Sequence, residues 1–575
     1  MIRRMVCHPV VGLGLVIAAI LASDCCFAQV QEILPAQGTP QLIFSTYLGG
    51  LTPCASCADD RTFAQNAGSD AQGNTYVTGG TRSSTLPVLN AWQPRPAPHS
   101  SMSAFVAKYD PAGRLLWLTY LGGNEETMGV GVAAMPDGGV AVAGMTTSDG
   151  SEPFPTMNAF QNQNNGGSDY FVTVFDANGN LRYSTYLGGS GQDGSGFTDD
   201  NSNGNNVAVD AHGLVYVTGT TSSGGSSGGI KFPVTYNALQ SDLKGSTDSF
   251  MCIFDPAKSG VDSLIYCSFL GGNRDEKGHS IAVNAAGDLI TAAGYTDSDD
   301  FPTTPNAYRS HYAPGFTSNG FVAQFKSSKP GDPSSEYTAR YSTYLGADSS
   351  KARDDLYGMV MDTNGLILGT GRTQSADFPM TGPGTPFLFN SAPYLGHGES
   401  NDQPFLVKID PSLDGKASLV YSTFLGGGKK GWGSFCTSVG ADSHGKAYVS
   451  GETNAPGVLY TPIPVPASVF VPSPTYFPYT ADALITSLQG QEDVEFMQVT
   501  ADGKQLGYST YLGGTGAERA YGLAVDPDGN VVVTGLTSSS DFPLKNPAQT
   551  YPGNNAQNAF IAKFSFAAAS GDGKP

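Results

Sequence analysis

The chain has 575 residues with a formal net charge of -20, although only 14% of its residues are charged. An acidic chain without a run of Lys or Arg would repel a phosphate backbone, so the composition argues against a nucleic-acid partner. Its 74 Gly and 37 Pro residues indicate many tight turns and few helices.

The first 28 residues have the pattern of a secretory signal peptide. Arg3 and Arg4 give a positive start, residues 10–22 are an apolar run, and Ala28 is a small residue before a cleavage point. A run of 13 apolar residues is shorter than the roughly 20 that a membrane span needs. We therefore expect a protein that is secreted, periplasmic or on the cell surface, with no membrane span after the signal is removed.

Residues 29–40 are expected to lead into a repeat that begins at residue 41. A strand that ends in Leu-Gly, such as YSTYLGG at residues 183–189, occurs seven times at intervals of 66 to 87 residues. Its leucines are Leu48, Leu121, Leu187, Leu270, Leu345, Leu425 and Leu512. A long internal repeat determines the fold before any local motif is considered.

Three further segments recur in each unit. The last unit shows them as GLAVDPDGN at residues 522–530, VVVTGLT at 531–537 and AFIAKFS at 559–565. Asp-x-x-Gly between two alternating runs is typical of a tight hairpin turn, because Asp caps the turn and Gly adopts a positive φ. Each unit is therefore predicted to be four antiparallel strands with side chains on two faces.

Four-stranded units that stack face to face around an axis form a β-propeller, so we predict an all-β fold with seven blades. The blades are expected at about residues 51–121, 124–187, 190–270, 273–345, 348–425, 428–512 and 515–566. The chain begins with a lone fourth strand at residues 41–48 and ends after a third strand. We therefore predict that residues 41–48 complete the last blade and close the ring, followed by a flexible tail at 567–575.

These motifs resemble the SBBP repeat, a seven-bladed β-propeller family of bacterial secreted and surface proteins. The resemblance depends on YSTYLGG, on AVDxxGNxYVTG and on T-x-S-x-D-F-P, which occurs at residues 296–302, 373–379 and 537–543. It covers essentially residues 41–566. The family implies export and an interaction surface but not one activity, because function depends on a site rather than on a fold.

One loop has the ligand spacing of a calcium site. Asp199, Asn201 and Asn203 occupy alternate positions, Asp210 is at the twelfth position, and Asn205 can add its backbone carbonyl. Asp210 is also the aspartate of the repeat's own turn, and it is shorter than the Glu usual at this position. The alternative is an ordinary turn rich in Asn and Gly.

After the signal, the chain has five cysteines: Cys54, Cys57, Cys252, Cys267 and Cys436. The odd number leaves at least one thiol or an intermolecular bond. Cys252 and Cys267 are expected on the third and fourth strands of one blade, where a disulfide is compatible with the spacing but not required. Cys54 and Cys57 lack a second ligand pair for zinc and a helix start for redox chemistry, so we interpret them as a local disulfide or two unreactive thiols.

Acidic residues follow several of the Leu-Gly turns: Glu125, Glu126, Asp193, Asp275, Glu276, Asp354, Asp355 and Glu518. On a ring they would lie on equivalent loops of one face. Either each residue only caps or solvates its own loop, or the set forms an acidic rim that binds a cation or a glycan.

The sixth unit departs from the repeat. A Pro-rich, aromatic segment at residues 459–480 replaces its D-F-P segment. It is either a long loop that lies on its own blade or an exposed apolar ridge for a partner.

The sequence shows no nucleophile–base pair, metal-ligand cluster or cofactor fingerprint. We predict a monomeric, non-enzymatic binding scaffold for an extracellular protein or polysaccharide. The alternative is a polysaccharide lyase or glycosidase-like enzyme with carboxylates at the central channel, because different blades can supply such groups without a sequence motif.

Overall fold

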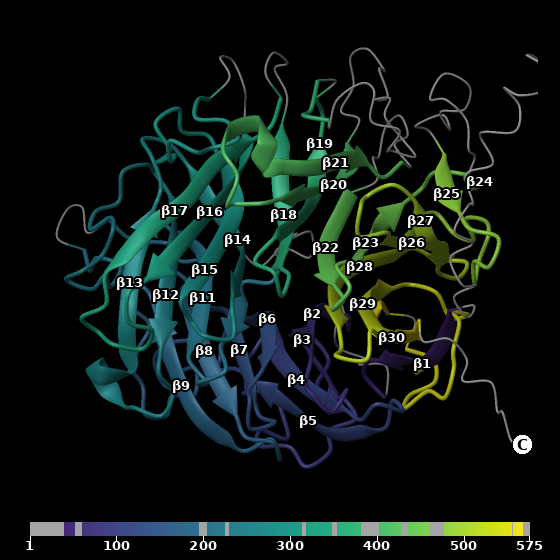
Figure 1. Cartoon of the computed structure of the whole chain (residues 1–575). Helices are drawn as coiled ribbons and strands as arrows, with labels where there is room; N and C mark the ends of the chain where they lie inside the picture. The colour runs from purple at the N-terminus through teal and green to yellow at the C-terminus, as the bar shows by residue number, and fades with distance from the viewer. Residues whose placement is uncertain are drawn as a thin grey trace, which may run out of the picture. The chain divides into compact units, whose positions relative to one another are not determined.

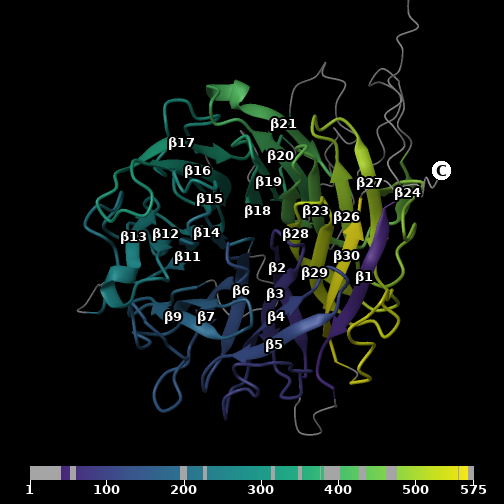
Figure 2. The same ribbon diagram turned by 60° about the horizontal axis from the view of Figure 1, so that its bottom comes forward.

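A computed structural model describes residues 40–51, 60–194, 204–224, 229–312, 318–347, 353–375, 377–380, 402–426, 435–460, 476–554 and 556–566. Between residues 40 and 566 they form seven four-stranded antiparallel sheets in a ring (Figures 1 and 2), which confirms the predicted fold. The helical turns of this described part are short, and none has the length and hydropathy of a membrane-crossing helix.

Each blade runs from an inner strand near the axis to an outer edge strand. The strands of blades 1 to 3 are β2 (Thr62–Ser69), β3 (Thr75–Thr81), β4 (Ser103–Tyr109), β5 (Leu115–Leu121); β6 (Thr127–Ala134), β7 (Val140–Thr146), β8 (Asp169–Phe175), β9 (Leu181–Leu187); and β10 (Val207–Val209), β11 (Val215–Thr221), β12 (Asp248–Phe254), β13 (Leu264–Leu270). Those of blades 4 and 5 are β14 (Glu276–Val283), β15 (Leu289–Thr296), β16 (Asn319–Ser327), β17 (Tyr337–Leu345); and β18 (Asp354–Met361), β19 (Ile367–Thr373), β20 (Gln403–Ile409), β21 (Leu419–Phe424). Those of blades 6 and 7 are β22 (Phe435–Ala441), β23 (Ala447–Thr453), β26 (Asp493–Val499), β27 (Leu506–Leu512); and β28 (Glu518–Val525), β29 (Val531–Thr537), β30 (Asn558–Ser565), β1 (Gln41–Leu48).

The ring is closed by its two ends, as the phase of the repeat predicts. β1 is antiparallel to β30, from Gln41 opposite Ser565 to Leu48 opposite Ala559, and Figure 2 shows the purple strand beside the yellow one. The Tyr47 hydroxyl donates to the Ser539 carbonyl (2.9 Å) and accepts from the Phe542 N–H (3.0 Å). The first strand is thus part of the last blade.

The two sides of the ring are distinct and are named here for the turns they carry. The Asp-x-x-Gly turns lie on the turn face, where the inner strands end. The Leu-Gly-Gly turns lie on the LGG face, where the inner strands begin. Between the two faces, aromatic side chains of the outer strands fill the space between blades; Tyr183, for example, is 0% exposed and its hydroxyl is 2.9 Å from that of Ser263 in the next blade.

A recurring Asn-x-x-Gln segment covers the outer edge strand of several blades. In blade 1, Leu89 and Leu118 exchange backbone hydrogen bonds, and the Gln93 side chain accepts from the Gly122 N–H (3.2 Å). Asn90 begins the segment at φ 47°, a conformation that Asn adopts more readily than most residues. The segment satisfies backbone groups that an open edge would expose.

The described cysteines differ in whether they form a disulfide. Cys252 on β12 and Cys267 on β13 are directly opposite in register and form a disulfide, which was left open by the sequence. Cys436 is a free, buried thiol. Cys54 and Cys57 lie outside the described residues.

Other predicted segments also lie outside the described residues. They are the signal at residues 1–28, nearly all of 29–40, and the tail at 567–575. Within the segment 459–480 of blade 6, the structure describes the two ends. β24 (Gly457–Leu459) and β25 (Phe477–Tyr479) pair in parallel, and Phe477 is fully buried.

Candidate functional site

A cavity lies on the axis of the ring, toward the turn face. Its volume is about 270 Å³, and residues of all seven blades, mostly from the inner strands, line it. The described lining residues are mainly small or apolar, with Asn66, Ser69, Asn205 and Ser438 as polar members, and none of them is Asp or Glu. The carboxylate pair that a glycosidase needs is therefore not found in the described lining of this cavity.

Most inner strands carry a bulge at the same place in their pairing with the second strand. The shifted residues are Gln65, Val130, His279, Tyr357, Thr437 and Tyr521. His279 is representative: its Nδ1 is 3.1 Å from the Leu356 carbonyl of the next blade, and its ring stacks on Tyr357. Burial lowers the pKa of His279 to about 4, so this imidazole is neutral at neutral pH.

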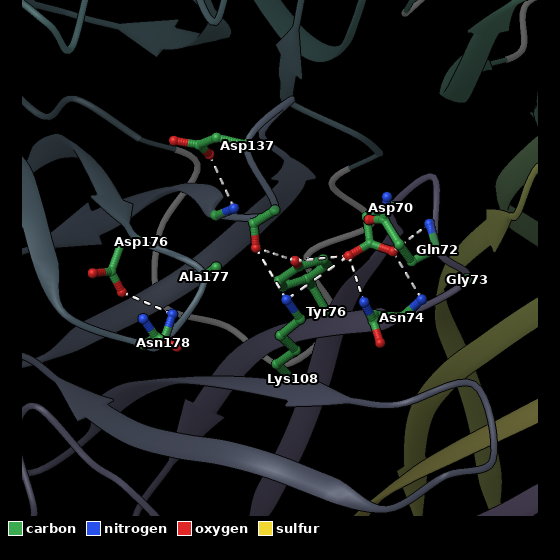
Figure 3. Close-up of polar contacts among 12 residues, drawn as sticks. Asp70, Gln72, Gly73, Asn74, Tyr76, Lys108, Asp137, Asp176, Ala177 and Asn178 are labelled. Carbon is green, nitrogen blue, oxygen red and sulfur yellow. Dashed lines mark hydrogen bonds and ion pairs between the residues drawn. The ribbon is translucent and has the colours of Figure 1, made fainter.

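On the turn face, carboxylates join blades to one another (Figure 3). Asp70 Oδ1 accepts from the backbone N–H groups of Gln72 (3.0 Å) and Asn74 (2.9 Å), which closes its own turn. Its Oδ2 is 3.0 Å from the Tyr76 hydroxyl and 3.8 Å from Lys108 Nζ. Tyr76 and Lys108 also lie 2.6 and 3.0 Å from the Gly138 carbonyl of blade 2.

The same arrangement recurs where blade 7 meets blade 1. Lys563 Nζ is 2.8 Å from Asp526 Oδ2 and donates to the Gly73 carbonyl of blade 1 (2.7 Å). Both side chains of the ion pair are 1% exposed. The charged side chains of these turns are thus paired with partners inside the fold.

On the LGG face, nine side chains form two groups, one on blades 4 and 5 and one on blades 6 and 7, and several of them are partly exposed. We call the two groups together the charge cluster; it consists of Lys277, Tyr295, Arg353, Asp355, Arg372, Asp402, Glu452, Glu492 and Arg519. Its members begin or precede inner strands, end second strands or precede third strands, so they lie on one face of blades 4 to 7.

The part of the charge cluster on blades 4 and 5 surrounds a buried carboxylate. Asp355 is 0% exposed, and its Oδ2 is 3.2 Å from Arg353 Nη2 and 3.0 Å from Arg372 Nη2. The half-buried Tyr295 ring lies 5.9 Å from Arg353 Cζ and 5.8 Å from Lys277 Nζ. Burial raises the pKa of Tyr295 to about 12, so its phenol stays protonated at neutral pH.

The part on blades 6 and 7 centres on Arg519. Its Nε is 3.3 Å from Glu452 Oε2 and 3.2 Å from Glu492 Oε2. In blade 6, the Cys436 thiol on β22 donates to Glu495 Oε1 on β26 (3.1 Å). Burial raises the pKa of Glu495 to about 8, which favours a neutral acid there.

Four of the eight acidic residues after the Leu-Gly turns do not belong to a solvated rim. Asp193, Glu276, Asp354 and Glu518 are buried. Each accepts from a backbone N–H of its own turn and from a Thr of the neighbouring strand; Glu518, for example, accepts from Gly514 N (2.8 Å) and Thr537 Oγ1 (2.7 Å). The turn-capping interpretation therefore describes these four residues.

The candidate calcium loop is described only at its end. Asp199, Asn201 and Asn203 lie outside the described residues. Asn205 precedes and Asp210 follows the short strand β10.

Both described residues of that loop also have other partners. The Asn205 carbonyl accepts from Ile281 N–H (2.8 Å). Asp210 caps its own turn through His212 and Leu214 N–H groups and accepts from the Tyr216 hydroxyl (3.0 Å). These contacts show Asp210 in its turn role. The calcium prediction for Asp199, Asn201, Asn203, Asn205 and Asp210 stays a prediction.

The charge cluster was missed in the sequence because its residues stand beside the repeated motifs, not in them. The available signal was an exchange of residue type at equivalent positions. Arg372 precedes the last residue of β19, where the equivalent residue is Met145 on β7 and Leu536 on β29. Alignment of the blades at this position would have identified Tyr295, Arg372 and Glu452 in blades 4 to 6. In blade 7 the charge is on the opposite residue of the inner strand, Arg519.

Two comparisons of sequence found similar proteins, and the first of them agrees with this architecture. Residues 507–543 match the family model of SBBP, described as a beta-propeller repeat. Regulatory protein FlaEY of Caulobacter vibrioides is 26% identical over 201 residues, which are 35% of this chain and 19% of that protein. The chain thus spans about a fifth of the length of this curated relative.

Solved structures are similar to this chain only at low identity and low TM-score. A protein of unknown function from Dyadobacter fermentans is 11% identical, with 92% of this chain and 99% of that chain covered and a TM-score of 0.33. A polysaccharide lyase described as an ulvan lyase is 9% identical, with 86% and 93% covered and a TM-score of 0.38. A quinohemoprotein alcohol dehydrogenase from Pseudomonas putida is 10% identical, with 94% and 78% covered and a TM-score of 0.35. At this level none of them bears on the activity of this chain.

Proposed function

We propose that this SBBP-repeat β-propeller is an exported binding protein that holds an extracellular polysaccharide or protein at its charge cluster. Export is supported by the signal pattern of the first 28 residues. Binding at the LGG face is supported by one observation above all: the cations of the cluster are only partly covered, with the Arg353 side chain 41% and the Arg519 side chain 27% exposed.

The cluster has the groups that recognise an acidic sugar chain. An aromatic face beside two cations, as at Tyr295, suits a sugar ring that carries a carboxylate. The ion pairs to Asp355 hold the guanidinium groups in place before a ligand arrives, so less side-chain entropy is lost on binding. We therefore favour an acidic polysaccharide over a neutral one.

The experiment is a binding panel on the mature chain with polygalacturonate, alginate and dextran, measured by calorimetry at low salt. We expect binding of at least one acidic polymer, no binding of dextran, and weaker binding by Arg353→Gln, in which Asp355 keeps Arg372 as a partner. Lack of binding to all three polymers would refute the polysaccharide form. Binding that is unchanged in Arg353→Gln would refute the location.

A lyase-type enzyme is a second candidate, favoured by the juxtaposition of His279 and Tyr295. Their rings are 5.4 Å apart, and at neutral pH the imidazole is neutral while the phenol carries a proton. A neutral base beside a protonated phenol is a pair suited to acid–base chemistry. The same panel tests it: ultraviolet absorbance of unsaturated ends that is lost in Tyr295→Phe would support a lyase, and its absence would support binding alone.

A further inference from the structure

Three junctions between blades contain two buried carboxylates that face the first glycine of a Leu-Gly-Gly turn. One acid begins the third strand of a blade. The other belongs to the next blade: Glu276 and Glu518 begin inner strands, and Asp193 forms an isolated bridge with Thr221 at the end of β11. All six side chains are 0% exposed. The pairs are Asp169 with Asp193, Asp248 with Glu276, and Asp493 with Glu518.

The two acids of a pair approach the same point. A Cβ placed on Gly513 would lie 2.6 Å from Asp493 Oδ1 and 2.6 Å from Glu518 Oε2. Gly188 and Gly271 have the corresponding two carboxylates as the nearest neighbours of their Cβ positions. Only glycine leaves room for both oxygens.

In the first pair, hydrogen-bond donors leave one carboxylate oxygen of Asp169 without a partner, so it can share a proton with Asp193. Asp169 Oδ2 accepts from Gln161 Nε2 (2.7 Å) and the Asn165 N–H (3.0 Å), whereas Asp169 Oδ1 has no donor. Asp193 accepts from the Thr221 and Ser223 hydroxyls and from the Gly189 N–H. None of these donors carries a charge.

Two ionised carboxylates buried this close disfavour one another, and burial alone already favours the neutral acid. Burial, with the partner carboxylate adding to it, raises the pKa of Asp169 and Glu276 to about 7 and that of Asp493 to about 6. Burial raises the pKa of Asp248 too, and the positive charge of Lys244 acts on it in the opposite direction. The other titratable groups that face the pairs are the phenols of Tyr170, Tyr186, Tyr344, Tyr511 and Tyr47.

Other junctions of the same ring do without a second acid. Across Gly346, Asp354 faces Asn319, and across Gly122, Thr127 lies near Ser103. An amide or a hydroxyl therefore suffices to build the junction. The second carboxylate is an addition at three places, not a requirement of the repeat.

We propose that each of the three acid pairs holds one shared proton in the folded ring, and that loss of these protons loosens the junctions as pH rises. The proton is bound in the folded state but not in the unfolded chain, whose carboxyls have ordinary pKa values near 4. The stabilisation that each shared proton gives is therefore fully present below about pH 4 and is lost as pH rises through about 6 to 7. Within that window each pair lowers the folding constant by about tenfold per pH unit.

The experiment compares denaturant unfolding of the mature chain at about pH 5 and pH 8 in three proteins. In Asp169→Asn the amide N–H donates to Asp193 in place of the shared proton. We expect this variant to be more stable than the parent at pH 8 and to lose less stability between the two pH values. Asn319→Asp creates a fourth pair with Asp354, and we expect this variant to lose more stability than the parent between the two pH values.

Glu495 and Asp297 also have raised pKa values, but they are present in all three proteins and cancel in the comparison. The raised pKa of Asp354 cancels between the parent and Asp169→Asn, whereas in Asn319→Asp this residue belongs to the new pair. The same loss of stability in all three proteins would overturn the proposal. So would a pH 8 stability of the parent that calcium restores and magnesium does not, because the pairs would then bind a cation. A carboxylic-acid C=O infrared band that is present at pH 7 and weaker in Asp169→Asn would support it.

Discussion

The turn face and the LGG face of this ring use the same kinds of charged side chain for different purposes. On the turn face, Lys563 and Asp526 are both 1% exposed, and the lysine also donates to the next blade. On the LGG face, Arg353 pairs with Asp355 but keeps 41% of its side chain in solvent. The first pair is enclosed by the fold on all sides, and the second is open on one.

This difference separates structural charges from candidate binding charges. A fully buried pair is costly to leave incomplete, because the remaining charge has no solvent. A half-exposed pair contributes little to stability, because water screens it. Substitutions on the two faces should therefore differ in what they change: stability on the turn face and binding on the LGG face.

The largest expected effect on stability comes from removing β1, the strand that completes blade 7. Deletion of residues 29–48 removes β1 and with it Phe44, Tyr47 and Leu48, each at most 1% exposed. At about 3 kcal/mol or more for each large side chain, the loss is about 10 kcal/mol, as much as the whole stability of many domains. We expect no cooperative melting transition at the parent temperature by calorimetry. A truncated chain that melts like the parent would show that closure contributes nothing.

Next in size is the loss of one partner on the turn face. Lys563→Met leaves the Asp526 carboxylate buried without its cation, at an expected cost of about 3–5 kcal/mol. The measurement is denaturant unfolding near neutral pH. Lys563→Met/Asp526→Asn should recover part of the loss, because no buried charge remains. Equal stability of the single and the double variant would place the cost in packing instead.

The fold was predictable because every blade repeats the same physical solution. Alternation in YSTYL predicts two buried faces, and Tyr183 and Tyr186 are indeed buried on both sides of β9. The offset between the first and last strands predicts closure, which the pairing of β1 with β30 confirms. Each of these inferences needs only neighbours in sequence and the number of strands in a blade.

The candidate site was not predictable in the same way, because strand direction and burial decide it. The acids after the Leu-Gly turns suggested a solvated rim, yet Glu276 and Asp354 point inward and are capped by hydroxyls. Thr127 occupies the equivalent position in blade 2 and bonds to Thr146. A hydroxyl that replaces an acid was the available sign of an internal hydrogen-bonding position. The charge cluster requires side chains from four blades, which spacing along the chain cannot bring together.

A calcium response would distinguish a turn aspartate from a ligand aspartate. If the loop at Asp199, Asn201 and Asn203 binds with a dissociation constant near 10⁻⁴ M, about 10⁻³ M calcium stabilises the fold by about 1.4 kcal/mol. We expect Asp199→Ala to abolish this gain. Asp210→Asn should lower stability equally with calcium and with chelator, because Asp210 serves its own turn. Melting curves with magnesium control for general screening, and an equal gain from both ions would leave no specific site.

The smallest effect on stability is expected on the LGG face. Lys277 is half-exposed, and its ammonium lies 5.8 Å from the Tyr295 ring, an interaction of about 0.5–1 kcal/mol at such a position. Lys277→Ala should therefore change the free energy of unfolding by less than about 1 kcal/mol, while affinity for the acidic polysaccharide falls about tenfold. Lys326→Ala is the matched control, because Lys326 is an exposed lysine near the turn-face end of β16 in the same blade. We expect no change of affinity there. If both lysine variants weaken binding alike, the polymer senses the overall charge of the protein, and the distinction between the two faces fails for binding.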